Sequence, residues 1–397
     1  MKKILEDIKV LDLTQALYGP FCNMILADLG AEVLKVEPPW GSSDRISRGA
    51  RFGGTSAQSL YINVGKKSMP IDLKNPKGLE IFKKLVPQSD VVVQNFLPGV
   101  MERLGLGYEV LKSLNPRVIY AALSGFGQTG PYRERASYAS MAEAIAGLSR
   151  LTGDYIDPNG PPRRIAESYG DLGPALWAAL SIVAAILHRY RTGIGQMIDV
   201  AQADCMVALT PSIVAYNLTG LLPWQEQEKY RMVQPIRSGI LKVKDGWIRV
   251  AGGRPRALDA LKERLKVEEV NEKVLGELVE NMTRDEAVTY LVELGFPVAP
   301  IYNIGETTKD PHLIARGMFV EIEHPIAGKV KIPNFPVKFS ETPGEHISAA
   351  PILGQHTKEI MMNRLGYSEE QIEQLENEGV IVTVKYSRTI ENTKKVN

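Results

Sequence analysis

Short β-rich runs alternate with helical patterns through the first third of the chain. Residues 9–13 (KVLDL) predict a strand, residues 20–29 a helix and residues 32–36 (EVLKV) a second strand, which together make a βαβ unit. The alternation continues with a helix over 76–86, a strand over 91–96, a helix over 100–114 and a strand over 118–123. This order predicts an α/β fold with a doubly wound parallel sheet, like that of nucleotide-binding domains.

The sequence pattern changes in the middle of the chain. Residues 222–320 are a charged strand-and-helix segment that predicts a small α+β domain. We expect the large α/β domain to comprise residues 1–215 and 326–397, with linkers at 216–221 and 321–356. The second linker is rich in Pro and Gly, which indicates an extended return to the large domain.

Composition excludes several kinds of partner. Lys and Arg total 47 against 46 for Asp and Glu, so no overall field attracts nucleic acid or an anionic membrane. Only Cys22 and Cys205 are present, which is typical of a reducing compartment, and we expect a cytoplasmic protein. The longest apolar stretch, 172–187, is shorter than the roughly 20 residues of a membrane span and predicts a buried helix.

Common cofactor and catalytic motifs are absent. The turn after the first strand (TQALYGP) has one glycine where a dinucleotide fingerprint needs three, and neither a P-loop nor a GxSxG elbow occurs. All five histidines follow residue 187, without metal-binding spacing. We therefore expect no metal and no tightly bound cofactor, and chemistry in the N-terminal half must use carboxylate, amide, hydroxyl or basic groups.

One carboxylate stands out. Asp171 directly precedes a long helical run, in which Pro174 fits the first turn, and Gly193 and Gly195 end the pattern. An Asp in this position is usually an N-cap. The same helix N-terminus also favours the ionised carboxylate, ready to attack an electrophilic carbonyl. Position alone leaves both interpretations open.

Long segments carry a family resemblance. They are VLDLTQALYGPFCNMILADLGAEVLKVEPPWGSSDR at 10–45, NVGKKSMPIDLKNPKG at 63–78, DVVVQNFLPGVMERLGLGYEVLKSLNPRVIYAALSGFGQTGPY at 90–132, GDLGPALWAALSIVAAILHRYRTGIGQMIDVAQADC at 170–205, DPHLIARGMF at 310–319 and LGQHTKEIMMNRLGYSEEQI at 353–372. The chain resembles the class III CoA-transferases, the formyl-CoA and carnitine CoA-transferase family, which also includes α-methylacyl-CoA racemases. The resemblance implies an interlocked homodimer that moves CoA from an acyl-CoA thioester to a carboxylic acid through a covalent intermediate on Asp171, with CoA and acyl-CoA as substrates.

The resemblance also implies CoA contacts. By matched position these are Lys74, Asn95, Phe96, Arg103 and Tyr138, and we add Gln15. Taken singly, Lys74 and Arg103 also fit solvated surface charges, and Phe96 fits the core. Asp44 and Arg45 match a family segment near the active site, where a structural ion pair or turn is the alternative.

Departures from the family pattern narrow the chemistry. Leu17 replaces a Gln of formyl-CoA transferases, Ala139 replaces an acidic residue, and the glycine run before the small-domain strand is missing, so formyl-CoA or oxalate is not favoured. Arg231 and Arg237 occupy that last segment, as surface charges or as contacts for a distal carboxylate.

A racemase is the alternative function, but its histidine falls at or beside Tyr138, whose phenol is a poor base. A non-catalytic CoA-binding protein would not need Asp171.

Overall fold

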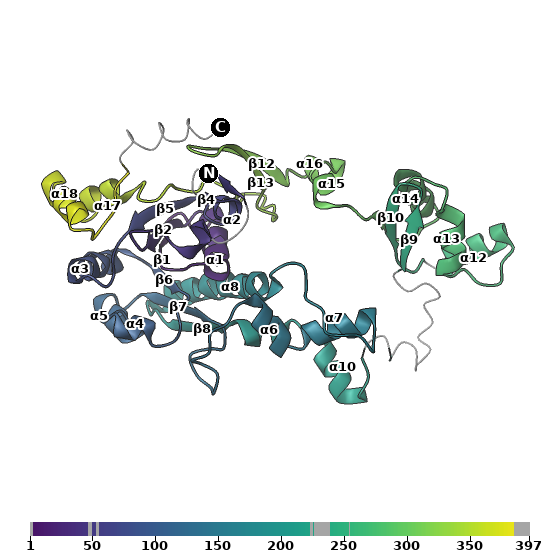
Figure 1. Cartoon of the computed structure of the whole chain (residues 1–397), viewed down its shortest axis with the longest axis horizontal. Helices are drawn as coiled ribbons and strands as arrows, with labels where there is room; N and C mark the ends of the chain where they lie inside the picture. Colours follow the sequence, from purple (N-terminus) through teal and green to yellow (C-terminus); the bar gives the residue numbers. More distant parts are fainter. Residues whose placement is uncertain are drawn as a thin grey trace. The chain divides into compact units, whose positions relative to one another are not determined.

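A computed structural model describes residues 3–46, 50–52, 55–222, 225, 239–253 and 255–384. The chain forms two compact units (Figure 1). The first comprises Met1–Ile213 and Gly317–Asn397, and the second comprises Val214–Arg316. Each unit has its own hydrophobic core among the described residues.

A six-stranded, wholly parallel sheet organises the first unit. Its order is β5-β2-β1-β6-β7-β8. The strands are β1 (Lys9–Asp12), β2 (Glu32–Glu37), β5 (Lys66–Pro70), β6 (Val91–Gln94), β7 (Ile119–Ser124) and β8 (Met197–Ala201). The expected doubly wound sheet is thereby confirmed. The sequence prediction missed β5, whose lysines hide a strand pattern, and β8.

Helices cover both faces of this sheet (Figure 1). One face packs against α3 (Pro76–Leu85), α4 (Val100–Arg103), α5 (Tyr108–Leu114), α17 (Thr357–Asn363) and α18 (Glu369–Asn377). The other face packs against α1 (Tyr18–Asp28) and α8 (Tyr169–Thr192). The single helix predicted over 100–114 is wrong, because Gly105 takes a left-handed conformation and separates α4 from α5.

The strand order reverses direction between β1 and β6. From β1 the chain builds outward through β2 to β5, and then returns to the other side of β1 to add β6, β7 and β8. Parallel sheets bind ligands beyond the carboxyl ends of their strands at such a switch point. The segments that follow β1 and β6 are therefore the first place to look for a site.

The remaining elements of the first unit surround this framework. They are η1 (Ser43–Arg45), β3 (Arg51–Phe52), β4 (Thr55–Ser56), α2 (Ala57–Ile62), η2 (Val86–Gln88), α6 (Ala139–Ile145), α7 (Leu148–Ile156), α9 (Gln202–Ala208), β12 (Phe319–His324) and β13 (Gly328–Pro333). Helix α10 (Ser212–Thr219) crosses the boundary between the units. The long return segment that follows β13 is anchored on the first unit by backbone hydrogen bonds, among them Gly65 N–H to Ser348 O and His356 N–H to Ser68 O.

The second unit is a small α+β structure. Its antiparallel sheet has the order β11-β10-β9. The elements are β9 (Gly239–Val243), β10 (Gly246–Val250), α12 (Pro255–Leu265), α13 (Glu272–Val279), α14 (Arg284–Glu293), β11 (Val298–Pro300), α15 (Ile304–Thr307) and α16 (Pro311–Ala315). Arg231 and Arg237 lie outside the described residues.

Helix α8 is long and apolar on its outer face as well as its inner one. It is long and apolar enough to cross a membrane by length and composition, but 44% of its most apolar window is buried against the unit. Leu176, Trp177, Leu180 and Leu187 are exposed on its outer side. It ends, as expected, at Gly193 in a left-handed conformation. Pro174 lies in the second turn and not in the first.

A group of charged side chains is buried near the carboxyl ends of β1 and β2 and the start of β5, namely Asp12, Lys35, Glu37, Asp44, Arg45 and Lys66. The Lys66 ammonium donates to Asp12 Oδ2 at 3.0 Å, to the Pro20 carbonyl at 2.9 Å and to Asn63 Oδ1 at 3.0 Å. Its three hydrogens are thus all used, as a buried ammonium requires. Every hydrogen of the Lys66 ammonium has an acceptor, so the fold is destabilised when one member of this network is removed.

We predict that Lys66→Met lowers the free energy of unfolding by about 3–5 kcal/mol, because the Asp12 carboxylate would stay buried without its cation. Urea-induced unfolding at neutral pH measures the loss. The matched control is Lys67→Met, which removes a partly exposed cation paired with Glu32 and Glu359 and should cost about 1 kcal/mol or less. Equal losses in the two variants would contradict the role given to Lys66.

Candidate active site

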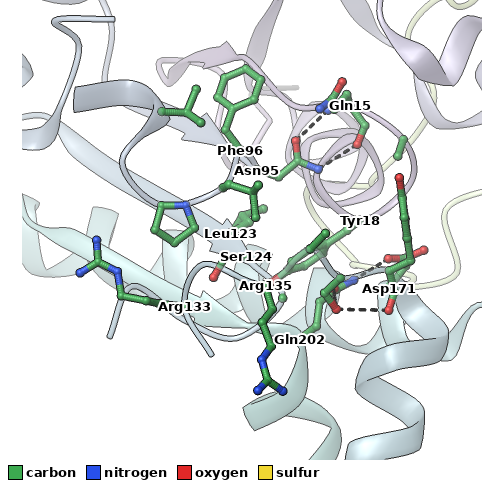
Figure 2. Close-up of a pocket in the computed structure, with 18 of the residues that line it drawn as sticks. Gln15, Tyr18, Asn95, Phe96, Leu123, Ser124, Arg133, Arg135, Asp171 and Gln202 are labelled. Carbon is green, nitrogen blue, oxygen red and sulfur yellow. Dashed lines mark hydrogen bonds between the residues drawn. The ribbon is translucent and has the colours of Figure 1, made fainter. Parts of the chain in front are cut away.

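A cavity of about 480 Å³ opens at the switch point of the sheet (Figure 2). Segments that follow β1, β6, β7 and β8 form its walls, together with the starts of α6 and α8. Of the residues predicted from the sequence, it brings together Gln15, Asn95, Phe96, Tyr138 and Asp171. Two smaller cavities of about 210 Å³ adjoin it through shared lining residues.

The two strand ends at the switch point are tied together by an amide pair. The Gln15 backbone N–H donates to Asn95 Oδ1 at 2.9 Å, and Asn95 Nδ2 donates to the Gln15 carbonyl at 2.8 Å (Figure 2). The next residue, Ala16, takes a left-handed conformation with φ 65°. Such a conformation costs of order 1 kcal/mol outside glycine and is commonest at functional sites. The Asn95 side chain therefore shapes the cavity wall as well as lining it.

Asp171 lies in the first turn of α8 and lines both the main cavity and one of the smaller ones. The helix begins after Ser168, so Asp171 is the third helical residue and not the N-cap. The Gly170 N–H donates to the buried Glu143 carboxylate of α6 at 2.9 Å. The positive end of the helix dipole favours the anionic form of a carboxylate at this position. The arrangement suits a carboxylate nucleophile.

Gln202, which the sequence prediction missed, orients this carboxylate. Its Nε2 donates to Asp171 Oδ1 at 2.6 Å (Figure 2). Gln202 is the first residue of α9 and directly follows β8, so it stands at the carboxyl end of a parallel strand. Recognising MIDVA at 197–201 as a strand would have placed Gln202 at the same edge as Gln15 and Asn95. The missed strand thus explains the missed residue.

Tyr18 forms part of the cavity wall between Asp171 and β8. Its hydroxyl donates to the Val200 carbonyl at 3.1 Å. Burial, with smaller contributions from Cys205, Cys22 and then Asp171, holds the pKa of Tyr18 well above its usual range. Tyr18 is therefore a neutral phenol with its proton committed, which suits it to packing and not to acid–base work.

The other residues predicted to contact CoA lie in different places. Phe96 lines the main cavity and the smaller one that contains Lys74 and Trp40. Tyr138, at the N-cap of α6, is 69% exposed and lines the main cavity and the cavity on the far side of Asp171. Arg103, at the end of α4, is exposed and lines none of these three cavities.

Asp44 and Arg45 are structural members of the buried charge network. Arg45 makes a two-point ion pair with Glu37, at 2.7 Å for each nitrogen. Asp44 accepts from Asn63 Nδ2 at 2.7 Å and lies 3.3 Å from the Lys35 ammonium. Burial opposes ionisation of Asp44, but Lys35 and these hydrogen bonds outweigh it and lower the pKa of Asp44 to about 2. Asp44 and Arg45 thus form structural ion pairs, with Lys35 and Glu37 respectively, as the alternative interpretation of this segment predicted.

Cations that sequence reasoning did not single out also line the main cavity. Arg133 and Arg135 lie in the loop before α6, and Arg135 stacks on the ring of Tyr132 with its guanidinium carbon 3.7 Å from the centroid. Guanidinium groups bind phosphates and carboxylates through paired hydrogen bonds. The cavity thus combines a carboxylate set on a helix N-terminus with cationic groups suited to an anionic ligand.

We predict that Gly170→Ala destabilises the protein, because an added Cβ would lie 2.2 Å from the backbone carbonyl oxygen of Ala139. Forcing α6 and α8 apart should cost about 1–3 kcal/mol, as overpacking does. The control is Gly173→Ala in the same helix, whose Cβ would meet only the side chains of Leu209 and Met206. Thermal unfolding should show a loss for the first variant and little change for the second; the reverse order would refute the close approach.

Comparison with known proteins agrees with this geometry. The model of CoA-transferase family III matches residues 5–357. The chain is 36% identical to succinyl-CoA–D-citramalate CoA-transferase of Chloroflexus aurantiacus, over 95% of this chain and 98% of that protein. It is 35% identical to succinyl-CoA:glutarate CoA-transferase of Homo sapiens, over 96% of this chain and 90% of that protein.

A solved structure shares the fold. The crystal structure of a CAIB/BAIF family protein from Brucella suis superimposes with a TM-score of 0.80 at 30% identity, covering 92% of this chain and all of that one. The family match spans most of the chain, both curated relatives are CoA-transferases, and the solved structure has the same architecture. The chain therefore belongs to CoA-transferase family III and is a CoA-transferase of that class.

Proposed function

We propose that Asp171 is the covalent nucleophile of this CoA-transferase. The observation that carries the proposal is the position of its carboxylate, which lines the switch-point cavity from the first turn of α8 and is held at 2.6 Å by Gln202. A carboxylate is a weak nucleophile, so it needs fixed orientation and exclusion of competing water. The helix N-terminus and the buried amide supply the orientation.

The chemistry follows from the group itself. The Asp171 carboxylate attacks the thioester carbonyl of an acyl-CoA and expels CoA thiolate, which leaves a mixed anhydride. The thiolate then attacks the Asp171 carboxyl carbon, releases the donor's carboxylate and forms an aspartyl-CoA thioester. An acceptor carboxylate reverses the two steps and leaves as the new acyl-CoA. Dividing the transfer into steps of similar energy is what covalent catalysis achieves.

CoA would extend from Asp171 across the switch point. Gln15 and Phe96 line both the main cavity and the smaller one beyond it, and Asn95 lines the main cavity. Lys74 lines that smaller cavity and supplies a cation there, while Arg133 and Arg135 supply cations in the main cavity. Phosphates of CoA need such partners. Tyr138 would pack on the pantetheine arm near the thioester, whereas Arg103 could meet CoA only outside these cavities.

The substrates are proposed from the relatives. Both curated relatives described above are named for succinyl-CoA, with citramalate or glutarate as the second substrate. We infer that this protein also takes a dicarboxylic acyl-CoA donor and a dicarboxylic acceptor. The cavity on the far side of Asp171 contains Arg164, which supplies a cation for a distal carboxylate. Formyl-CoA and oxalate are not proposed.

The assembly and location remain proposals as well. We propose a homodimer with interlocked chains in the cytoplasm. The exposed apolar residues Leu176, Trp177, Leu180 and Leu187 give α8 a continuous outer face that a second copy would cover. Cys22 and Cys205 are both free thiols, as the cytoplasm allows.

We expect wild-type protein incubated with succinyl-CoA to carry CoA on the peptide that contains Asp171, and hydroxylamine should convert this adduct to a hydroxamate. In deuterium oxide the α-carbon of the acyl group should stay unlabelled, because transfer breaks no carbon–hydrogen bond. Asp171→Ala should lose at least about 10⁴-fold in transfer rate. Mass spectrometry reads all three results.

The control for that experiment is Asp204→Asn, which changes an exposed carboxylate in α9 and should transfer CoA at the wild-type rate. Rapid α-deuteration without an adduct would refute the covalent intermediate on Asp171. An Asp171→Ala variant that retains a tenth of the activity would refute the nucleophile.

The interlocked dimer makes a separate prediction. Tagged and untagged dimers mixed under native conditions should not form a mixed dimer, because interlocked chains cannot separate while folded. Mixed dimers should form only after joint unfolding and refolding. Native mass spectrometry measures the exchange, and a monomer that appears on dilution would contradict the interlocked assembly.

A further inference from the structure

The Gln202 side chain is a buried amide built into the site. It is only 4% exposed, and its Nε2 lies 2.6 Å from Asp171 Oδ1 (Figure 2). On its other side, the Ser137 hydroxyl donates to Gln202 Oε1 at 3.3 Å. A carboxylate only accepts hydrogen bonds, so the amide nitrogen must face Asp171. The Ser137 hydroxyl also lies 3.3 Å from the Tyr138 carbonyl, so the orientation of the amide is set by Asp171.

The segments that hold the Gln202 amide are closely packed. A Cβ on Gly125 would lie 2.1 Å from Ser137 Cβ, so the loop after β7 passes directly against the residue that contacts Gln202. The Ala203 N–H donates to the Gly125 carbonyl at 3.0 Å and fixes the start of α9 to the same point. Gln202 is therefore set in place before any substrate binds, which is the condition for electrostatic catalysis.

We propose that the Gln202 carboxamide is the oxyanion donor for the reactions at the Asp171 carboxyl carbon. The proposal rests on Asp171 being the nucleophile. It assigns Oδ2 to attack on the acyl carbon; as that bond forms, the carbon–sulfur bond breaks and its electron pair leaves on the CoA sulfur. Oδ1 remains as the carbonyl oxygen of the anhydride and keeps its hydrogen bond to Gln202.

The hydrogen bond matters most in the second step. When CoA thiolate attacks the Asp171 carboxyl carbon, an electron pair moves onto Oδ1, which becomes an oxyanion. Collapse of this intermediate breaks the bond to Oδ2, and the donor's carboxylate leaves with that oxygen. In the first step, by contrast, negative charge leaves Asp171. A donor aimed at Oδ1 therefore stabilises the transition states at the Asp171 carbon and not the attack on the acyl carbon.

The test uses Gln202→Met, which keeps the length of the side chain and removes its amide. Rapid-quench mass spectrometry with succinyl-CoA should show aspartyl-CoA forming about 10²–10³-fold more slowly, the usual effect of losing one oxyanion donor. The anhydride should then persist, so CoA thiol should appear to a thiol reagent and hydrolysis should rise relative to transfer. A purely structural role would lower all steps together.

A second variant guards against misfolding as the explanation. Gln202→Glu places an acid beside Asp171, and an acid can donate to Oδ1 only when it carries a proton. The ratio of its transfer rate to the wild-type rate at the same pH should therefore rise as the pH falls. A parallel pH profile for Gln202→Glu and wild type would overturn the inference.

The outcomes separate the two proposals. If wild type forms no adduct on Asp171, the proposed nucleophile fails. If wild type forms the adduct and Gln202→Met forms it at the same rate, only the oxyanion role of Gln202 fails. Asp204→Asn, two residues away on the exposed side of α9, is the matched control and should behave as wild type in every measurement.

Discussion

Burial of charge beneath the carboxyl edge of the sheet is the constraint on which the rest of the first unit depends. Lys35 and Lys66 are fully buried, so each must be surrounded by acceptors. Lys35 donates to the Thr14 carbonyl at 2.9 Å, and Asp12, held by Lys66, accepts from the Thr14 backbone N–H at 2.8 Å. The turn after β1 is thereby fixed by ions that take no part in the proposed reaction, and the strained Ala16 can persist there.

Side-chain amides also hold the site together at this turn and at the start of α8. Asn95 joins the ends of β1 and β6, and Gln202 joins the end of β8 to the start of α8. Both amides act between segments far apart in the sequence. A carboxylate carried on a helix N-terminus thus faces a cavity whose walls are joined by hydrogen bonds, which helps to keep a weak nucleophile in an attacking orientation.

The fold was largely predictable because hydrophobic periodicity and helix signals are local. The β1–α1–β2 unit and the long helix from Asp171 to Gly193 were found this way. Lys66 and Lys67 disguised β5, since a buried ion pair cannot be read from a lysine alone. Gln202 was missed because its role depends on the order of strands, which no single segment encodes. The predicted CoA contacts other than Gln15 came from resemblance, and Arg103 lines none of the three cavities that the others line.

The contact between Gly170 and Ala139 limits how such a site can diverge. The obstacle to any side chain at position 170 is a backbone carbonyl, so no substitution at position 139 can relieve it. Position 170, next to the nucleophile, is therefore closed to gradual change. New substrate preferences would have to arise from side chains that face the cavities, such as Tyr138 and Arg164, while the geometry of the nucleophile stays constant. In a fold built this way, specificity and chemistry can evolve separately.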